Sequence, residues 1–166
     1  MISSYSDKDV NIVTLKPETA VSALDTPIEI SQFDFTDEKT REKRFKTNAI
    51  WDTGASGTVI TQTVVDALEL KPLGVARVNT ASQTGIQCLT YSIRLHLNTD
   101  LSIVILKAIV GKVKENIDCL IGMDIIGLGD FSITNFEGRM CMSFRFPSKH
   151  EIDYCKNPKL IIESAV

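Results

Sequence analysis

The 166-residue sequence predicts a mainly-β fold with two short helices. Apolar residues gather in short segments that alternate with polar ones or form brief apolar runs. Turn-forming residues bound these segments, as expected for strands. Only two segments change to a helical pattern. Hydrophobic residues make up 43% and charged residues 23% of the chain, values typical of a globular domain with a core.

The first part of the chain contains three strand candidates. Residues 1–26 are poor in aromatic side chains and include one short candidate, at residues 10–15. Residues 27–35 alternate apolar and polar side chains, and residues 44–51 rise into an apolar run that ends at Trp51. Because a charged turn separates these last two segments, they predict a β-hairpin.

The pattern changes to helical spacing over residues 61–70, after a short strand candidate at residues 58–60. Thr61 is a residue type that caps helix N-termini, and Pro72 prevents the helix from continuing. The apolar residues of this segment share one helical face: Val64, Val65 and Leu68. This segment is the first of the two predicted helices.

The remainder of the chain returns to strand patterns around a second short helix. Strand candidates lie at residues 75–78, 86–97, 101–110, 118–122, 131–136 and 140–146. The small, polar segment 79–85 contains glycine and suits the tip of a hairpin. Residues 123–128 predict the second helix, with Asp124 as its cap. In the C-terminal tail, residues 159–163 form one more strand candidate.

Charge and hydropathy exclude several kinds of partner. The formal net charge is −3 and no block of Lys or Arg is present, so we expect neither nucleic acid nor a membrane as a partner. Residues 1–10 are polar and acidic, unlike a signal peptide. No apolar run approaches the roughly 20 residues that cross a membrane. These features predict a cytoplasmic protein.

The cysteine and histidine positions do not predict a metal site. None of the four cysteines belongs to a Cys-x-x-Cys pair, and the two histidines lack metal-ligand spacing. The residues concerned are Cys88, Cys119, Cys141, Cys155, His96 and His150. We therefore expect no metal or other cofactor, and we favour free thiols in a reducing compartment over a disulfide.

One segment combines residues that carry chemistry. The apolar residues 49–51 lead directly into Asp52-Thr53-Gly54. A carboxylate at the end of a buried strand needs hydrogen-bond donors, and the glycine lets the backbone turn so that N–H groups point back at it. An Asp-(Ser/Thr)-Gly tripeptide occurs by chance in roughly one chain in ten of this length, so the motif alone is a weak signal.

A second segment strengthens the signal. Residues 119–124, Cys-Leu-Ile-Gly-Met-Asp, form another apolar strand that ends in glycine and leads into a short helix. The order of a strand with Asp-Thr-Gly, a hairpin tip, a strand with Gly and a short helix resembles the retropepsin family, the single-domain, retroviral-type aspartic proteases. It looks especially like the bacterial members, which have segments similar to residues 121–126, 129–131 and 144–148 here.

The resemblance implies a retropepsin-like fold. This is a closed β-barrel that forms one half of an acid protease, with a flap hairpin and two short helices. The resemblance covers about residues 27–148, which we take as the protease domain. An N-terminal extension (residues 1–26) precedes this domain and a C-terminal tail (residues 149–166) follows it.

The resemblance also assigns roles within the Asp-Thr-Gly loop. Asp52 matches the catalytic aspartate, and Thr53 matches the threonine whose hydroxyl bonds across a dimer axis. Gly54 matches the glycine that allows close backbone approach. Ala55 stands where pepsin-like enzymes often carry a serine that donates to the aspartate, so we expect activity at mildly acidic pH.

Two further segments match elements of the family. Residues 79–87 match the flap that closes over bound peptide. Its candidate substrate contacts are Thr80, Ala81, Ser82, Gly85 and Ile86. The apolar-apolar-Gly segment that packs beneath the catalytic loop is matched by Leu120, Ile121 and Gly122. Val110 and Ile126 are additional candidates for lining a substrate pocket.

The chemistry that the resemblance implies requires a dimer. Two carboxylates about 3 Å apart share a proton, so one acts as a base toward water and the other as an acid toward the scissile carbonyl. The chain contains a single Asp-Thr-Gly, so an identical chain must supply the second carboxylate through two-fold symmetry. We therefore expect a C2 homodimer that hydrolyses extended polypeptides as an aspartic endopeptidase.

Two other interpretations stay open at this point. A catalytically silent protease-fold module could serve dimerisation or peptide binding. Asp52→Asn distinguishes it from a protease, because binding should survive this substitution and cleavage should not. A serine or cysteine hydrolase is the other. Against it, the chain has no Gly-x-Ser-x-Gly motif, and neither His96 nor His150 lies in a setting suited to a catalytic base.

Overall fold

The structure of the chain is a computed structural model that describes residues 1–7, 9–19, 21–34, 43–79 and 83–156. Strands dominate the described part and both helices are short, which confirms the predicted mainly-β class. In chain order the elements are β1 (Ile2–Asp7), β2 (Val10–Leu15), β3 (Asp25–Gln32), β4 (Arg44–Trp51), β5 (Val59–Ile60), α1 (Gln62–Leu68), β6 (Gly74–Val78), β7 (Ile86–His96), β8 (Ser102–Val110), β9 (Cys119–Ile121), α2 (Met123–Ile126), β10 (Asp130–Phe136) and β11 (Arg139–Phe146).

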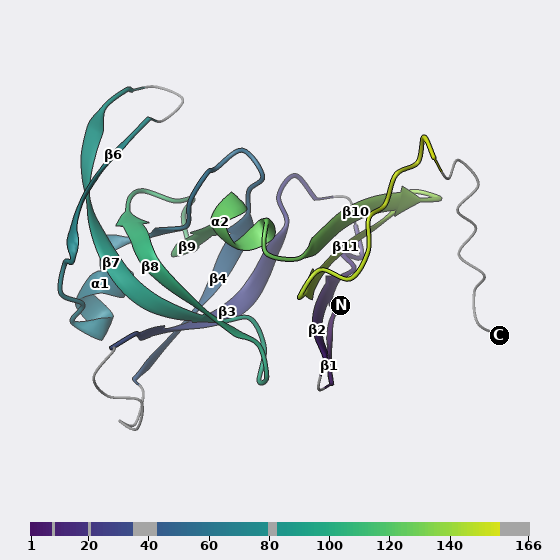
Figure 1. Cartoon of the computed structure of the whole chain (residues 1–166), viewed down its shortest axis with the longest axis horizontal. Coiled ribbons are helices and arrows are strands. Elements are labelled where there is room, and N and C mark those ends of the chain that lie inside the picture. The colour runs from purple at the N-terminus through teal and green to yellow at the C-terminus, as the bar shows by residue number, and fades with distance from the viewer. Residues whose placement is uncertain (8, 20, 35–42, 80–82, 157–166) are drawn as a thin grey trace.

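Strands β3 to β9 form a closed barrel (Figure 1). Their order is β3-β4-β9-β5-β8-β7-β6, and an additional pairing of β3 with β7 closes the sheet. The closing contact runs from Glu29 opposite His96 to Gln32 opposite Ile93. The closed β-barrel that the resemblance implied is therefore confirmed.

The alternation that predicted the strands also builds the barrel core. In β3, Thr26, Ile28 and Ile30 are buried, whereas Pro27 is exposed and Glu29 is partly exposed. Strands β3, β5, β7 and β9 all contribute side chains with no exposed surface: Ile30, Ile60, Ile93, Leu95 and Ile121. Burying one such side chain contributes roughly 1.5–3 kcal/mol, so these residues supply much of the stability of the barrel.

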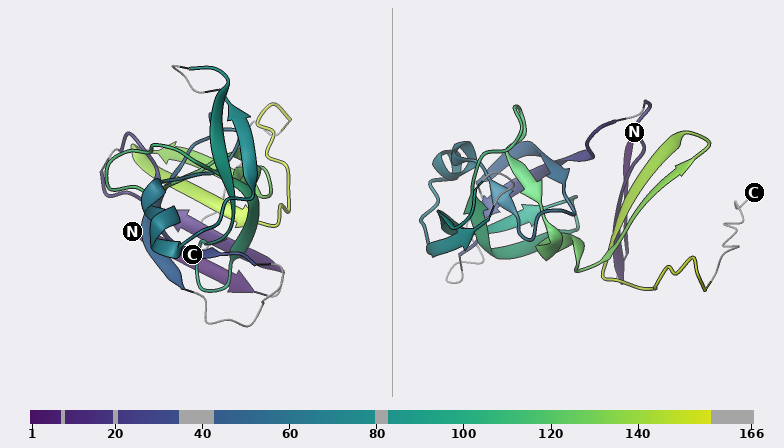
Figure 2. Two further views of the ribbon diagram at one scale, coloured as in Figure 1. Left: turned by 90° about the vertical axis from the view of Figure 1, so that its left-hand side faces the viewer. Right: turned by 90° about the horizontal axis from the view of Figure 1, so that it is seen from above.

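A second, four-stranded antiparallel sheet stands beside the barrel, with the strand order β1-β2-β11-β10 (Figure 2). Strand β2 lies opposite β11, with Val13 facing Phe144 and Leu15 facing Met142. All four of these side chains are buried and belong to the same hydrophobic core as the barrel residues. The two sheets are therefore packed together rather than merely linked.

Trp51, the last residue of β4, connects the two sheets. Its ring centroid lies 5.6 Å from that of Phe131 and 5.1 Å from that of Phe144. Its indole N–H donates a 3.0 Å hydrogen bond to the hydroxyl of Thr26, so the polar edge of the ring is satisfied while the ring is buried. The rings of Phe131 and Phe144 and the hydroxyl of Thr26 therefore hold in place the residue that immediately precedes Asp52.

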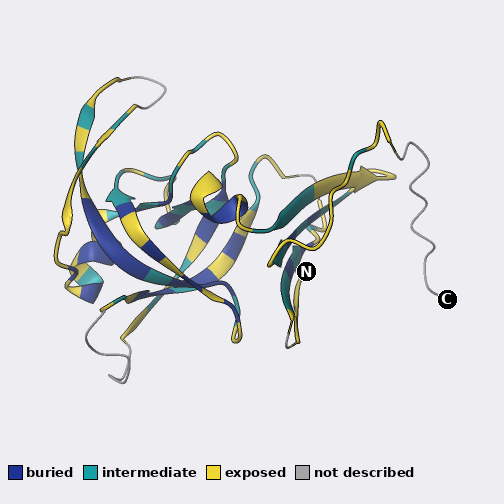
Figure 3. Cartoon of the chain, in the orientation of Figure 1, coloured by how far each residue is buried: buried dark blue, intermediate teal, exposed yellow. Residues whose placement is uncertain are grey.

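The structure differs from the sequence-based expectations at the N-terminus. Strand β1 was not predicted, because every one of its residues is exposed and it carries no apolar alternation (Figure 3). It forms through backbone pairing with β2, from Ile2 opposite Leu15 to Asp7 opposite Val10. The strand candidate at residues 159–163 lies outside the described residues.

Three expectations about function can be compared with the described part of the chain. There, no helix is long and apolar enough to cross a membrane. The same residues contain no cluster of three or more His, Cys, Asp or Glu side chains that could hold a metal ion. All four cysteines are free.

Candidate active site

Asp52 follows β4 directly and begins a loop that ends at Thr58, just before β5. The parallel pairing of β4 with β9 places Trp51 opposite Ile121. That pairing continues one residue further, because the Asp52 N–H donates to the Ile121 carbonyl at 3.0 Å. The backbone of Asp52 is therefore held by the barrel, while its side chain is half-buried.

The turn after Asp52 directs one backbone N–H toward its carboxylate and another toward its main-chain carbonyl. The Gly54 N–H donates to Asp52 Oδ1 at 2.8 Å, and the Ala55 N–H donates to the Asp52 carbonyl at 3.3 Å. A Cβ on residue 54 would lie 3.2 Å from Asp52 Oδ1, closer than ordinary contact, so glycine fits here best. Thr53 is exposed.

Strand β9 and the start of α2 lie against this loop. Leu120 pairs with Ile50 of β4 and with Val59 of β5, so β9 runs between the two strands that flank the loop. A Cβ on Gly122 would lie 2.6 Å from the carbonyl carbon and oxygen of Gly57. Because those are backbone atoms that cannot move aside cheaply, the absence of a Cβ at Gly122 allows the loop and the strand end to touch.

Asp124 lies at the same junction, in a role that sequence reasoning missed. It was expected to cap the second helix, but the N-cap of α2 is Gly122, and no side chain bonds there. The Asp124 carboxylate instead accepts two hydrogen bonds from Thr58, one from the backbone N–H at 2.9 Å and one from the hydroxyl at 2.8 Å. An aspartate near the start of a helix can either cap the helix or bond to a neighbouring loop, and the sequence alone does not distinguish these two roles.

Thr61, likewise expected to cap α1, occupies the N-cap position but makes no side-chain cap bond. Its hydroxyl donates to Asp118 Oδ1 at 2.7 Å, and the Thr47 hydroxyl donates to Asp118 Oδ2 at 3.1 Å. Between Asp118 and Asp124 lies Cys119, which is fully buried. Burial, together with the charges of these two carboxylates, raises the pKa of the Cys119 thiol well above its usual range, so this thiol is an unreactive core residue.

The hairpin of β6 and β7 extends beyond the barrel on the side of the Asp52 loop (Figure 1). Val78 lies opposite Ile86, and Gly85 adopts a positive φ of 70° and donates its N–H to the Asn79 side chain at 2.8 Å. Ile86 is half-buried. Thr80, Ala81 and Ser82, at the tip, lie outside the described residues. Of the other pocket candidates, Val110 packs against the core, and Ile126 is buried in it.

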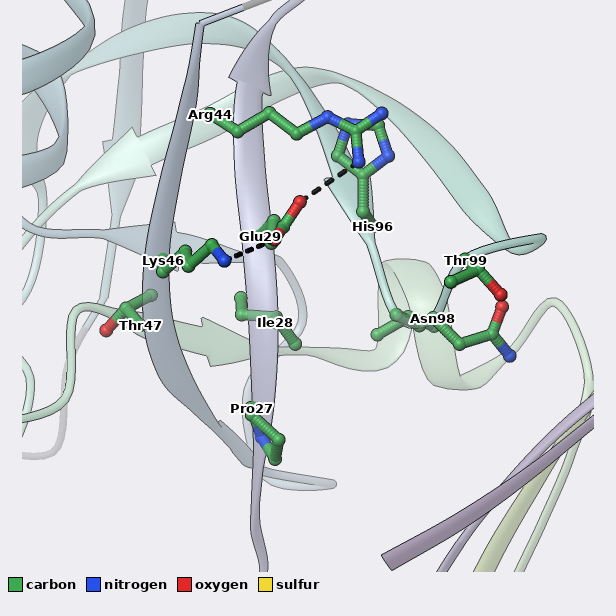
Figure 4. A pocket seen from close by; sticks show the side chains of 10 residues that line it. Pro27, Ile28, Glu29, Arg44, Lys46, Thr47, His96, Asn98 and Thr99 are labelled. Carbon is green, nitrogen blue, oxygen red and sulfur yellow. Dashed lines mark hydrogen bonds and ion pairs between the residues drawn. The ribbon is translucent and has the colours of Figure 1, made fainter.

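A groove of about 520 Å³ lies at the other end of β4, far along the strand from Asp52 (Figure 4). Within it, Glu29 binds Arg44 at 3.0 Å and Lys46 at 3.5 Å. The hydrogen bond from Arg44 is the largest influence that lowers the pKa of Glu29. Because the cations already pair with this carboxylate, the groove has the character of a solvated ion-pair cluster rather than a catalytic centre.

Comparison with known proteins gives a match to a family model and matches to solved structures. The family model described as aspartyl protease matches residues 40–125, just over half of the chain. Among solved structures, a retropepsin-like aspartic protease from Rickettsia conorii is similar with a TM-score of 0.40 and 15% identity. That alignment covers 76% of this chain and 97% of the other. A comparison with curated protein sequences finds no significant match.

Proposed function

The chain belongs to the aspartyl protease family, and we propose that it is an endopeptidase whose Asp52 acts in a pair with Asp52 of a second, identical chain. The observation that carries this proposal is the setting of Asp52. It ends a buried strand, its carboxylate accepts the Gly54 N–H at 2.8 Å, and its side chain stays half-buried. A carboxylate so placed is held by the fold and still open to a partner.

The proposed reaction uses the two aspartates as one acid and one base. At separations of about 3 Å, two carboxylates cannot both ionise cheaply, so they share a proton and titrate as a unit. The ionised member takes a proton from a water molecule, which attacks the peptide carbonyl. The protonated member donates to the carbonyl oxygen, and the tetrahedral intermediate forms without a covalent bond to the enzyme.

The single Asp-Thr-Gly in the sequence requires that the second aspartate come from another chain. Two-fold symmetry supplies an identical aspartate, provided that the loop lies on the axis. The exposure of Thr53 and Gly54 in one chain supports this arrangement, because both residues remain available for a symmetric contact. The active species we propose is a C2 homodimer.

The proposed substrates are polypeptides in an extended conformation. The β6–β7 hairpin, which extends on the side of the Asp52 loop, would act as a flap and hold such a chain by strand-like backbone hydrogen bonds. Its tip, with Thr80, Ala81 and Ser82, and the adjoining Gly85 and Ile86 would then lie nearest the bound chain. Alternate side chains of the substrate would enter pockets on either side, which would set the cleavage preference.

The test compares wild-type protein with Asp52→Asn on an unfolded polypeptide mixture between pH 4 and 7, with new termini identified by mass spectrometry. Asp66→Asn is the matched control, since Asp66 is exposed on α1 and its carboxylate binds only the nearby Gln62 side chain among the contacts described. Sedimentation at the assay concentration establishes whether a dimer is present.

Each outcome has a defined meaning. Cuts that appear with wild type and Asp66→Asn but not with Asp52→Asn support the proposal. Equal cutting by all three proteins would assign the activity to another group or to a contaminant. Dimeric wild-type protein that binds peptides without cutting them would instead support the catalytically silent module.

A further inference from the structure

We propose that Asp124 is a positioning residue for the active-site loop, an inference that rests on the proposed function of that loop. Asp124 lies in the first turn of α2 and makes no contact with Asp52 among those described. It acts through Thr58, the residue at which the loop joins β5. Without its carboxylate, the end of the loop would lose the side-chain bonds that hold it against the strand end beneath.

In the contact between Thr58 and Asp124, both donors of Thr58 are paired with the two carboxylate oxygens of Asp124. Thr58 has no exposed surface, so its N–H and hydroxyl need partners inside the protein. The N–H donates to Asp124 Oδ2 at 2.9 Å and the hydroxyl donates to Oδ1 at 2.8 Å. Bonds to an ionised carboxylate are stronger than neutral ones, and leaving the buried N–H unpaired is costly.

The loop is bonded to the β9–α2 junction at three places along its length, and Thr58 is the last of them. At the start of the loop, the Asp52 N–H donates to the Ile121 carbonyl at 3.0 Å. In the middle, the Ala55 carbonyl accepts from the Met123 N–H at 2.8 Å. Both of these bonds join backbone atoms and survive most substitutions. At Thr58, the hydroxyl also accepts the Gly122 N–H at a longer 3.5 Å, and the two shorter bonds depend on the side chain of Asp124.

A similar contact at the far end of β5 offers a built-in comparison. There Asp118 accepts from the Thr61 hydroxyl at 2.7 Å, and the Thr61 N–H donates to the Asp118 carbonyl at 3.0 Å. Two aspartates therefore hold the two ends of the same short strand. The end of β5 that Asp124 holds adjoins the loop that carries Asp52. The end that Asp118 holds leads into α1 instead.

The functional consequence follows from geometry. A displacement of about 1 Å in a catalytic group can reduce the rate about 100-fold, because the reacting atoms no longer align. Loss of the Thr58 contact frees the end of a loop only six residues from Asp52. Since Asp124 itself touches no substrate in this proposal, the loss should lie mainly in kcat, with KM changed less than about threefold.

The experiment compares Asp124→Ala, Asp124→Asn and Asp118→Ala, using a peptide that contains a site cut by the wild type. Kinetics are measured at concentrations where sedimentation shows each variant to be dimeric. Amide hydrogen exchange of residues 52–58 is measured in the Asp52→Asn background, which prevents self-cleavage. Thermal unfolding of each variant is measured alongside, so that loss of stability and loss of rate are separated.

The proposal predicts that Asp124→Ala lowers kcat about 10- to 100-fold and speeds exchange at Thr58. Asp124→Asn, whose side-chain oxygen can still accept the Thr58 N–H, should restore kcat to within about fivefold of wild type. Asp118→Ala should lower Tm to a similar degree and leave kcat within about threefold.

The proposal is overturned if Asp124→Ala keeps wild-type kcat, or if Asp118→Ala loses kcat equally. It is also overturned if Asp124→Asn is as impaired as Asp124→Ala. Should the wild type show no Asp52-dependent cleavage, the proposed function fails, and exchange alone then decides whether Asp124 holds the loop. Unchanged exchange at Thr58 in Asp124→Ala would refute that as well.

Discussion

Asp130, the first residue of β10, offers a test of how the four-stranded sheet is held at acid pH, where we expect the enzyme to act. Its side chain is 18% exposed. It accepts hydrogen bonds from Arg145 Nε at 2.8 Å, from the Ser148 hydroxyl at 2.6 Å and from the Lys149 N–H at 2.9 Å. The perturbation is Asp130→Asn, which keeps the shape and removes the charge.

The magnitude follows from the pKa of this carboxyl. Burial alone would raise the pKa of Asp130. The bonds from Ser148, the Lys149 N–H and Arg145, with the charge of Arg145, outweigh burial and lower the pKa from 3.8 to about 2. Each pKa unit corresponds to about 1.4 kcal/mol, so the ionised form contributes about 2 kcal/mol to folding. Because the folded pKa is depressed, this contribution is present above pH 4 and is lost as the pH falls through 2.

The assay is urea unfolding at pH 5 and pH 1.5, with and without Asp130→Asn, in the Asp52→Asn background to prevent self-cleavage. At pH 5 we expect Asp130→Asn to lower the free energy of unfolding by about 2 kcal/mol. At pH 1.5 the two proteins should be equally stable.

Glu137→Gln is the matched control for this measurement. Glu137 binds Arg139 at 2.7 Å, but the two side chains are 65% and 75% exposed, so the change should cost less than about 0.5 kcal/mol. If Asp130→Asn shows the same pH dependence as the unsubstituted background, the argument that this carboxylate is held ionised by its partners is refuted.

Two further predictions concern the neighbourhood of the Asp52 loop. Gly122→Ala places a Cβ 2.6 Å from the Gly57 backbone, so we expect a loss of about 1–3 kcal/mol and a Tm lower by roughly 2–12 °C. Gly74→Ala, whose Cβ would meet only an ordinary 3.5 Å contact, should stay close to wild type in the same thermal scan, and equal losses would contradict the reasoning. In the folded protein, iodoacetamide should modify the exposed Cys155 and spare the buried Cys119, which mass spectrometry would show. The modified protein should still cleave peptides. Modification of Cys119 without unfolding would show that its burial is incomplete.

Much of the architecture was predictable because its signals are local. Alternation in β3 and helical spacing in α1 depend only on neighbouring residues, and both elements overlap the predicted ranges, although β3 begins at Asp25 and ends at Gln32 rather than spanning residues 27–35. Asp52 was identifiable because three adjacent residues carry the motif and a second apolar strand ends in Gly122. Strand β1 left no such signal, since an exposed edge strand needs no apolar face.

The sequence by itself determined the mainly-β class, the order of the strands from β2 onward and Asp52 as the candidate catalytic residue. Only the tertiary structure decided which strands meet, such as β3 with β7, and which side chain holds the loop at Thr58. The physical reason is that these bonds join residues far apart in the chain. A threonine hydroxyl or an aspartate carboxylate can bond to many partners, and only folding selects between a helix cap and the contact that Asp124 makes.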